Sequence, residues 1–434
     1  MSEVSGPFLT DLDSRAAVKG SRDPLGAQAV WTRLGRHVVG NLTTVTTSVR
    51  DFTTLLLGYF WAERVSTEVG PGSELATFLK WEQLASYSRA KINGDYSFRG
   101  TERVKQTLSQ GSRVTLSNSR ASQILSNQQT YGIWGLYSVA SAASGLVEQD
   151  PARLTSEGLQ FVKSFYLPQF VDAGFPNGNR IVKLLSQPEA KVDLERADIA
   201  LSHVVAKILG PLTSEVERRF YYEHLVEGGP DDPTKGRQKL LAKLLGKHAQ
   251  SGEVKWSPAF LRALEKEARG AGEDGETLDY RLARIRACES VLAPAARLFA
   301  FMQGFDGKTI AAVAKIVRDQ WGPRVPAVNV DAIRELSYEF AEIREDIANR
   351  WIGFAESLAL GDYVSALRLL IEQNETTMQA RGGAAWISEE SGKLIVRVRD
   401  EQAGLPSLSE LSSLWRFPYF LDSMLAITSQ LRPN

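Results

Sequence analysis

The sequence is poor in the residues that bind metals or form crosslinks, with one cysteine, Cys288, and four histidines. A single cysteine excludes an intramolecular disulfide and is typical of a reducing cytoplasm. No histidine lies at a recognised ligand spacing from another histidine, a cysteine or a carboxylate, whereas metal sites need such clusters. We therefore expect a cytoplasmic protein without a metal ion or another cofactor.

Long apolar runs are missing as well. The most hydrophobic early stretch, Phe52–Ala62, has eleven residues, whereas a helix that crosses a bilayer needs about 20. Residues 1–20 carry acids and no apolar core, so they do not form a secretion signal. The sequence therefore predicts no membrane partner.

The chain also lacks net charge, because 51 basic residues balance 51 acidic ones. This balance excludes a globally basic nucleic-acid coat protein and an acidic tail protein, although a sum hides local asymmetry. Between Lys80 and Gln123 three acids face eight basic residues, an excess of five. The eight are Lys80, Arg89, Lys91, Arg99, Arg103, Lys105, Arg113 and Arg120. Such a cluster predicts a phosphate-binding surface.

Recognised catalytic motifs do not occur. Gly304–Thr309 contains Gly-Lys-Thr without the glycine spacing of a phosphate loop, so we expect it to cap a helix at Ile310–Gln320 instead. Cys288 has no accompanying histidine motif, which favours a buried small apolar side chain over a nucleophile. The sequence predicts no catalytic residue.

What the sequence does contain is helical periodicity. Apolar residues recur at spacings of three and four over Thr44–Val65, Glu74–Ile92 and Ile333–Leu358, which predicts three amphipathic helices. We expect the last of these to be one long helix that begins near Asp331 and ends at Gly361.

Two more helices and a β-hairpin complete the C-terminal pattern. A helix at Asp362–Ala380 can fold back on the long one, and a closing helix at Leu408–Leu431 is divided by Pro418. Ala384–Ser388 and Lys393–Arg399 flank Ser391-Gly392, which predicts the hairpin. The expected fold is mainly α, a multi-helix protein with a winged-helix-like module and a small C-terminal β-hairpin.

Glycine- and proline-rich breaks at Gly228–Pro233 and Gly270–Gly275 divide the chain. We expect four segments: an N-terminal helical region at 1–110, a winged-helix-like module with following helices at 111–228, a charged helical connector at 229–275, and a C-terminal helical domain with the hairpin at 276–434.

The winged-helix prediction depends on residues 145–158. Gly145 is placed to end a helix at Gly132–Ala143, and Leu146 and Val147 to enter the core. Asp150-Pro151 would form the tip of the wing, and Thr155 would cap the next helix. This order resembles the end of a winged-helix module.

If the module binds nucleic acid, five polar side chains are candidate contacts. Arginine suits phosphates or guanine, and glutamine suits adenine edges or phosphates. The candidates are Arg113, Arg120, Gln128, Gln129 and Arg153. Many winged helices bind only protein, however, and these basic residues would then merely solvate the surface.

The N-terminal block carries a family resemblance. Arg22-Asp23-Pro24-Leu25-Gly26 precedes a threonine-rich segment that ends at Arg50, and Tyr59-Phe60-Trp61 follows. These elements resemble a bacterial family that is often encoded in anti-phage defence islands. Val39-Gly40-Asn41 departs from the Pro-Gly of that family, and the aromatic residues come late. The resemblance implies a defence context and no catalytic residues.

The same residues also have a structural interpretation. Asp23 and Pro24 are placed to start a helix at Leu25–His37. A buried salt bridge among Arg22, Asp23 and Arg50, which would join the first two helices, is favoured over a ligand or DNA contact.

Together these features predict a non-enzymatic, DNA-associated subunit of a multi-protein anti-phage defence system. Its partners would be double-stranded DNA and other proteins of the same operon. One alternative is a helical adaptor that binds a partner enzyme without touching DNA. Another is a cryptic metal-dependent nuclease, whose carboxylates would lie near a lysine.

Overall fold

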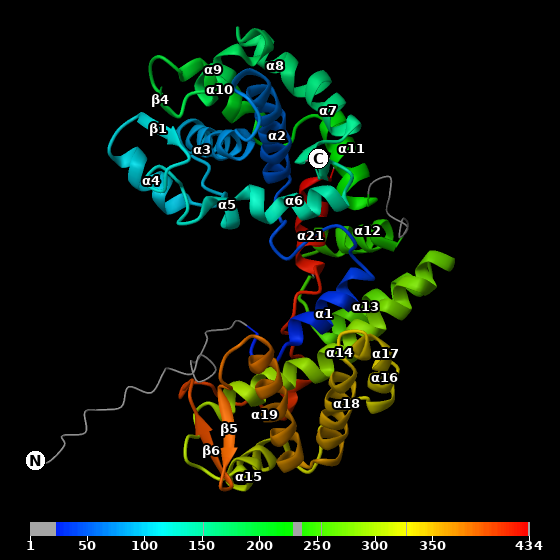
Figure 1. Ribbon diagram of the computed structural model, residues 1–434. Coiled ribbons are helices and arrows are strands. Elements are labelled where there is room, and N and C mark those ends of the chain that lie inside the picture. The colour runs from blue at the N-terminus through cyan, green and yellow to red at the C-terminus, as the bar shows by residue number, and fades with distance from the viewer. Residues whose placement is uncertain (1–22, 151, 229–236, 253, 327, 433–434) are drawn as a thin grey trace, which may run out of the picture. The chain divides into compact units, whose positions relative to one another are not determined.

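The computed structural model describes residues 23–150, 152–228, 237–252, 254–326 and 328–432 (Figure 1). This part of the chain is mainly helical, as predicted, and its strands form three antiparallel sheets of two strands each. None of its helices is both long and apolar enough to cross a membrane.

The chain divides into two compact units, and each combines distant stretches of sequence. The first unit comprises Met1–Val38 and Val254–Tyr419, and the second comprises Val39–Glu253 and Phe420–Asn434. The four consecutive segments expected from loop chemistry do not coincide with these units. Loop chemistry marks where the chain turns, whereas a unit is defined by which elements bury each other's apolar faces.

The second unit is centred on a helical hairpin of α2 (Val49–Val69) and α3 (Glu74–Asn93). Gly58 lets the two helices approach closely, because a Cβ there would lie 2.5 Å from the Phe78 ring. The α3 prediction is confirmed, while α2 begins later than predicted. Thr46 Oγ1 accepts a hydrogen bond from the Thr43 N–H and holds that stretch in a turn before the helix.

Short elements surround this hairpin. The helices are α4 (Thr101–Ser109), α5 (Gln128–Tyr131), α6 (Ile133–Ala143), α7 (Ser156–Phe161), α8 (Leu167–Asp172), α9 (Asn179–Leu185), α10 (Ile199–Ile208), α11 (Glu215–Tyr221), α12 (Arg237–Gln250) and α21 (Leu421–Gln430). The strands are β1 (Arg113–Ser117), β2 (Val147–Gln149), β3 (Ala152–Leu154) and β4 (Glu189–Asp193). Short 3-10 or π-helical segments lie at Val162–Tyr166, Pro176–Gly178 and Tyr222–Val226.

The local predictions around the wing are confirmed. Gly145 ends α6 with a φ of 70°, and Leu146 and Val147 are buried. β2 and β3 pair as an antiparallel hairpin, and Thr155 caps α7 by accepting a hydrogen bond from the Gly158 N–H. Residue 151, at the predicted tip, lies outside the described residues.

The winged-helix module as a whole is not confirmed. In such a module the strand that precedes the two helices joins the wing hairpin in one sheet. Here that strand is β1, and it pairs with β4 through Arg113–Asp193 to Ser117–Glu189. β2 and β3 therefore form a separate two-stranded sheet. The sequence pattern specified the hairpin and its caps, but not the pairing of β1 with a strand about 75 residues further on.

The cap at Thr155 gives a direct test of the local structure. Thr155→Ala is expected to lower the free energy of unfolding by about 1 kcal/mol, because its hydroxyl binds both Gly158 N–H and the carbonyl oxygen of Gly145. Urea unfolding followed by circular dichroism measures the loss. Thr155→Ser, which keeps the hydroxyl, should stay close to the unsubstituted protein; equal losses in both variants would show that the cap contributes nothing.

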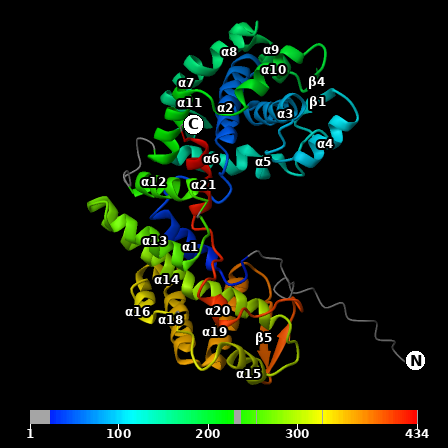
Figure 2. The ribbon, with the colours of Figure 1, turned by 180° about the vertical axis from the view of Figure 1, so that it is seen from behind.

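The first unit packs helices around the long α14. Its elements are α1 (Ala27–Arg36), α13 (Pro258–Arg269), α14 (Glu273–Met302), α15 (Ile310–Trp321), α16 (Val330–Arg334), α17 (Ser337–Ala341), α18 (Glu345–Leu360), α19 (Tyr363–Ala380), α20 (Leu408–Leu411), β5 (Ile387–Glu390) and β6 (Lys393–Val396). As predicted, α18 ends at Gly361 with a φ of 70°, and α19 packs back on it (Figure 2). The Thr309 cap of α15 is also confirmed. The closing helix is interrupted more widely than Pro418 alone predicted, because α20 ends at Leu411 and α21 begins at Leu421.

The long helix predicted over Ile333–Leu358 is wrong. The segment forms three helices, α16, α17 and α18, and Arg344 between the last two is extended with a φ of −171°. Of the eight apolar residues that set the period, Ile343 lies in the turn before α18 and is only partly buried. The other seven are nevertheless buried: Ile333, Leu336, Phe340, Ile347, Trp351, Phe354 and Leu358. The spacing of apolar residues predicts which side chains face the core. Two tight turns interrupt the helix here and still leave those side chains on the side that faces the core.

The C-terminal β-hairpin is confirmed. β5 and β6 pair from Ile387–Val396 to Glu390–Lys393. The two residues between the strands, Ser391 and Gly392, have φ values of 49° and 74°. Two successive positive φ values are typical of the tight turns that match the twist of a hairpin.

Candidate functional site

The basic stretch between Lys80 and Gln123 is largely neutralised by its surroundings. Lys80 is buried, and its amino group donates to the carbonyl oxygens of Leu185 and Gln187. Acids from elsewhere in the chain pair with three more of its cations, in the ion pairs Arg89–Asp51, Lys91–Glu195 and Arg113–Asp193. The excess counted along the sequence therefore does not form a continuous basic surface.

The five predicted nucleic-acid contacts are placed very differently. Gln128 is fully buried, and its side chain binds Gln83, Glu82 and two backbone groups, so its prediction as a contact is wrong. Arg113 and Arg153 are exposed but form ion pairs with Asp193 and Glu148. Arg120 and Gln129 are exposed and line one cavity of about 380 Å³. The structure thus brings together two of the five.

Gln128 is buried because it completes a polar network under α3. The Glu82 carboxylate accepts hydrogen bonds from Gln128 Nε2 at 2.8 Å and from the Ile133 N–H at 2.9 Å. Burial raises the pKa of Glu82 to about 7. A Cβ at Gly132 would lie 2.8 Å from this carboxylate, so the network requires glycine there. Its role is to attach α5 and α6 to α3.

The residues of the N-terminal motif are structural where they are described. Asp23 accepts hydrogen bonds from the first N–H groups of α1 and pairs with Arg381. Arg50 pairs instead with Glu217, so the predicted bridge between Asp23 and Arg50 is wrong. Arg22 lies outside the described residues. Glu217 lies 167 positions from Arg50, and no local sequence pattern indicates that the two residues pair.

The Arg50–Glu217 pair is the centre of a buried cluster in the second unit. Arg50 Nη2 lies 3.2 Å from Glu217 Oε2, and the Tyr166 hydroxyl donates to the same carboxylate. Hydrogen bonds of 2.8–3.4 Å connect the hydroxyl groups of Tyr166, Tyr221 and Thr53 to one another. Burial raises the pKa values of both tyrosines. The cluster thus joins α2 to α11 and the segment around Tyr166.

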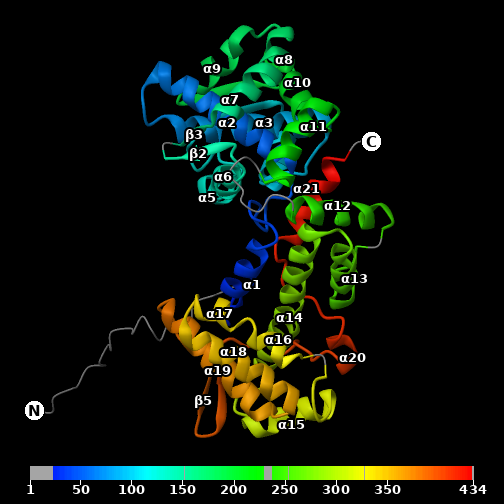
Figure 3. The same ribbon diagram turned by 90° about the vertical axis from the view of Figure 1, so that its right-hand side faces the viewer.

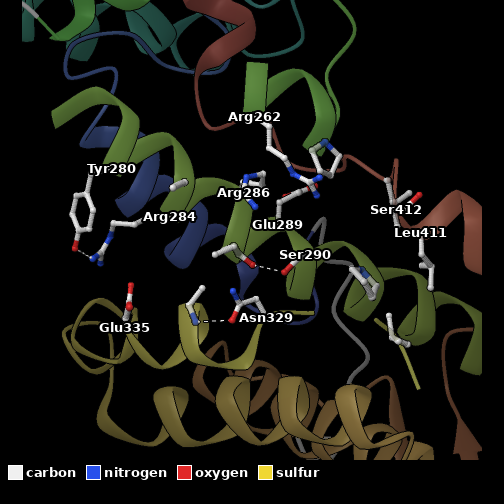
Figure 4. A pocket seen from close by; sticks show the side chains of 17 residues that line it. Arg262, Tyr280, Arg284, Arg286, Glu289, Ser290, Asn329, Glu335, Leu411 and Ser412 are labelled. Carbon is white, nitrogen blue, oxygen red and sulfur yellow. Dashed lines mark hydrogen bonds between the residues drawn. The ribbon is translucent and has the colours of Figure 1, made fainter. Parts of the chain in front are cut away.

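A cavity of about 160 Å³ lies in the first unit among α13, α14, α16 and α20 (Figure 4). Tyr280 and Arg284 lie at one side of it, and Leu411 and Ser412 at the other. Arg286 is paired with both carboxylate oxygens of Glu265. Arg284 pairs with Glu339, so two of the arginines that line the cavity already have carboxylate partners.

The floor of this cavity holds a fully buried carboxyl, Glu289. It accepts hydrogen bonds from the backbone N–H groups of Arg416 and Phe417 and from the Tyr419 hydroxyl at 2.9 Å. Burial raises its pKa to about 7. These three donors make Glu289 an anchor for the segment at 416–419. The adjacent Cys288 is buried, as predicted, and burial raises the pKa of its thiol, which suppresses nucleophilic character.

A groove in the second unit carries more basic side chains than either other cavity. It has a volume of about 530 Å³ and lies along α11, α12 and the C-terminal end of α21. α12 packs on α21, and the segment Tyr222–Val226 that follows α11 contacts both (Figure 3). Among the described residues that line it, Glu215 is the one acid. We call it the basic groove and define it by its six basic lining residues, Arg218, Arg219, Lys239, Lys243, Lys247 and Arg432.

Within the described part of the chain, three of these cations have an acidic partner, and the longest of the three contacts is Arg218–Glu215 at 3.8 Å. Arg219 pairs with Glu223 at 2.8 Å, and Lys239 pairs with Glu227. Lys243 is exposed and has no acidic partner among the described residues. Sequence reasoning missed this groove, although Lys239, Lys243 and Lys247 recur every four residues. That spacing places three lysines on one face of α12, a signal that a count of charges does not detect.

Comparisons with known proteins add no relationship: no protein-family model, no curated protein and no solved structure matches the chain. Within the described residues, no group of three or more histidine, cysteine, aspartate or glutamate side chains is arranged to hold a metal ion.

Proposed function

We propose that the protein is a non-enzymatic, DNA-associated subunit and that the basic groove is its DNA contact. The observation that supports this proposal is the lining of the groove, in which the described residues include six basic side chains and one acidic one. Clustered lysine and arginine side chains bind the phosphates of DNA and release condensed counterions. The proposed contact therefore lies on α11, α12 and α21 rather than on the wing.

The geometry of α12 suits an extended polyanion. Lys239, Lys243 and Lys247 span about 12 Å of helix axis, at a rise of 1.5 Å per residue. DNA carries a phosphate on each strand about every 3.4 Å along its axis, so the row matches several consecutive phosphates. Arg120 and Gln129 remain candidate contacts, because both are exposed.

The defence context is part of the proposal and is supported by the N-terminal resemblance alone. The elements that carry it are Asp23-Pro24-Leu25-Gly26 with Arg22, and the threonine-rich segment that ends at Arg50. In this context the partners would be double-stranded DNA and proteins encoded in the same operon. Co-purification with the products of neighbouring genes tests this part independently of DNA binding.

Charge reversal in α12 tests the DNA contact. Lys243→Glu/Lys247→Glu is expected to weaken binding to a 20-base-pair duplex by at least tenfold at about 0.1 M salt, because each substitution replaces an attraction to phosphate with a repulsion. Fluorescence anisotropy with a labelled duplex measures the dissociation constant.

The matched control is Lys183→Glu/Lys207→Glu, which changes net charge equally at two exposed lysines of the same unit. These lysines lie on α9 and α10, outside the lining of the groove. The control should change the dissociation constant less than threefold. Equal losses in both variants would assign binding to overall charge, and absence of binding by the unsubstituted protein would exclude the proposed function.

A further inference from the structure

One arginine of the basic groove, Arg218, has a buried guanidinium whose hydrogen bonds are not all satisfied. Arg218 is 9% exposed, and its buried Nε has no hydrogen-bond partner in the part of the chain that the structure describes. Its Nη2 donates to the Leu212 carbonyl oxygen at 2.7 Å, while its nearest ion-pair contact, to Glu215, is long at 3.8 Å. A buried cation with an unsatisfied donor is costly, so an anion that entered the groove would compete for this arginine only with the distant Glu215 carboxylate.

A second guanidinium of the groove shows the same feature. Arg432 Nη2 is buried and also has no hydrogen-bond partner among residues 23–432 as far as the structure describes them. The guanidinium lies against Gly246 of α12, where its Nη2 is 3.6 Å from the position a Cβ would occupy. Two arginines that lie more than 200 positions apart in the sequence therefore bring unsatisfied donors to one groove.

We propose that Arg218 and Arg432 form an oxyanion subsite of the basic groove that binds a phosphate group. The planar guanidinium presents parallel N–H donors whose spacing matches two oxygens of a phosphate, which a lysine ammonium does not offer. The lysines of α12 supply attraction along the groove, and the two arginines fix the position of one phosphate. This subsite rests on the proposed function in one respect, namely that the phosphate belongs to DNA. Free inorganic phosphate presents the same chemistry.

The test uses the full chain with inorganic phosphate alone as the probe, titrated by calorimetry at constant ionic strength against chloride. The unsubstituted protein should bind phosphate with a 1:1 stoichiometry. Arg432→Gln is expected to weaken phosphate binding at least tenfold, because the amide keeps some polarity but loses the charge and the fork. The phosphate affinity of Arg432→Lys should lie between those of the unsubstituted protein and Arg432→Gln, because lysine restores the charge but not the planar guanidinium.

Arg196→Gln is the matched control, since Arg196 is an exposed arginine of the same unit outside the groove. It should leave phosphate binding unchanged, and circular dichroism should show that all variants are folded. Because Arg432 is only half-buried, its substitution is less disruptive than one at Arg218.

The outcomes separate the subsite from the proposed function. Phosphate binding that depends on Arg432, together with DNA binding that weakens in the same variant, supports both. Phosphate binding without DNA binding supports the subsite and overturns the DNA function. DNA binding that Arg432→Gln leaves unchanged, with no phosphate binding, overturns the subsite alone.

Discussion

Glu217→Ala is expected to lower the free energy of unfolding by about 3–5 kcal/mol, because it leaves the buried Arg50 guanidinium without its counter-ion. Arg50 is 9% exposed and Glu217 is 3% exposed, so water cannot solvate the charge that remains. The substitution also removes the acceptor of the Tyr166 hydroxyl. Urea unfolding followed by circular dichroism and tryptophan fluorescence measures the loss.

Two further variants give this prediction its control. Glu223→Ala breaks the exposed ion pair with Arg219 and should cost less than about 1 kcal/mol. The double variant Arg50→Met/Glu217→Leu removes both charges and should be more stable than Glu217→Ala, because no unpaired charge remains buried. If Glu217→Ala lowered the free energy of unfolding by less than about 1 kcal/mol, the claim that Glu217 neutralises a buried Arg50 would be contradicted.

Glu289→Gln is expected to change how stability depends on pH. The pKa of the buried Glu289 carboxyl is raised by burial from 4.5 to about 7. Its stabilising contribution is fully present below pH 4.5, where both folded and unfolded chains are protonated. It is lost as the pH rises through about 7, because the unfolded chain ionises first.

The variant should therefore gain stability relative to the unsubstituted protein as the pH rises from about 4.5 to 8. The gain is on the order of 3 kcal/mol, from about 1.4 kcal/mol per pKa unit. Chemical denaturation across this range measures it. Glu335→Gln, an exposed residue that lines the same cavity, controls for the substitution itself. A difference between Glu289→Gln and the unsubstituted protein that stays constant with pH would contradict the raised pKa.

Sequence patterns predicted local structure well where one short stretch held all the information. The hairpin turn at Ser391-Gly392, the Thr155 and Thr309 caps and the Gly361 stop each depend on residues within a few positions. Glycine at positive φ and hydroxyl caps have strong local preferences, so these predictions are confirmed.

Predictions failed where a distant residue decided the outcome. Gln128 is buried because Glu82 and Gln83 of α3 bind it, and β1 pairs with a strand that follows it by about 75 residues. The partner of Arg50 is more remote still, 167 positions away. Charge counting failed in a related way: acids outside Lys80–Gln123 pair with its cations, while lysines of α12 lie together with Arg218 and Arg432.

The salt dependence of DNA affinity tests the proposed role of the basic groove most directly. Each phosphate contact that is lost reduces the slope of log K against log salt by about 0.9. The slope for Lys243→Glu/Lys247→Glu should therefore be shallower than that of the unsubstituted protein by about 2, whereas Lys183→Glu/Lys207→Glu should retain the original slope. Identical slopes for all three proteins, or no salt-dependent binding at all, would contradict a DNA contact in the basic groove.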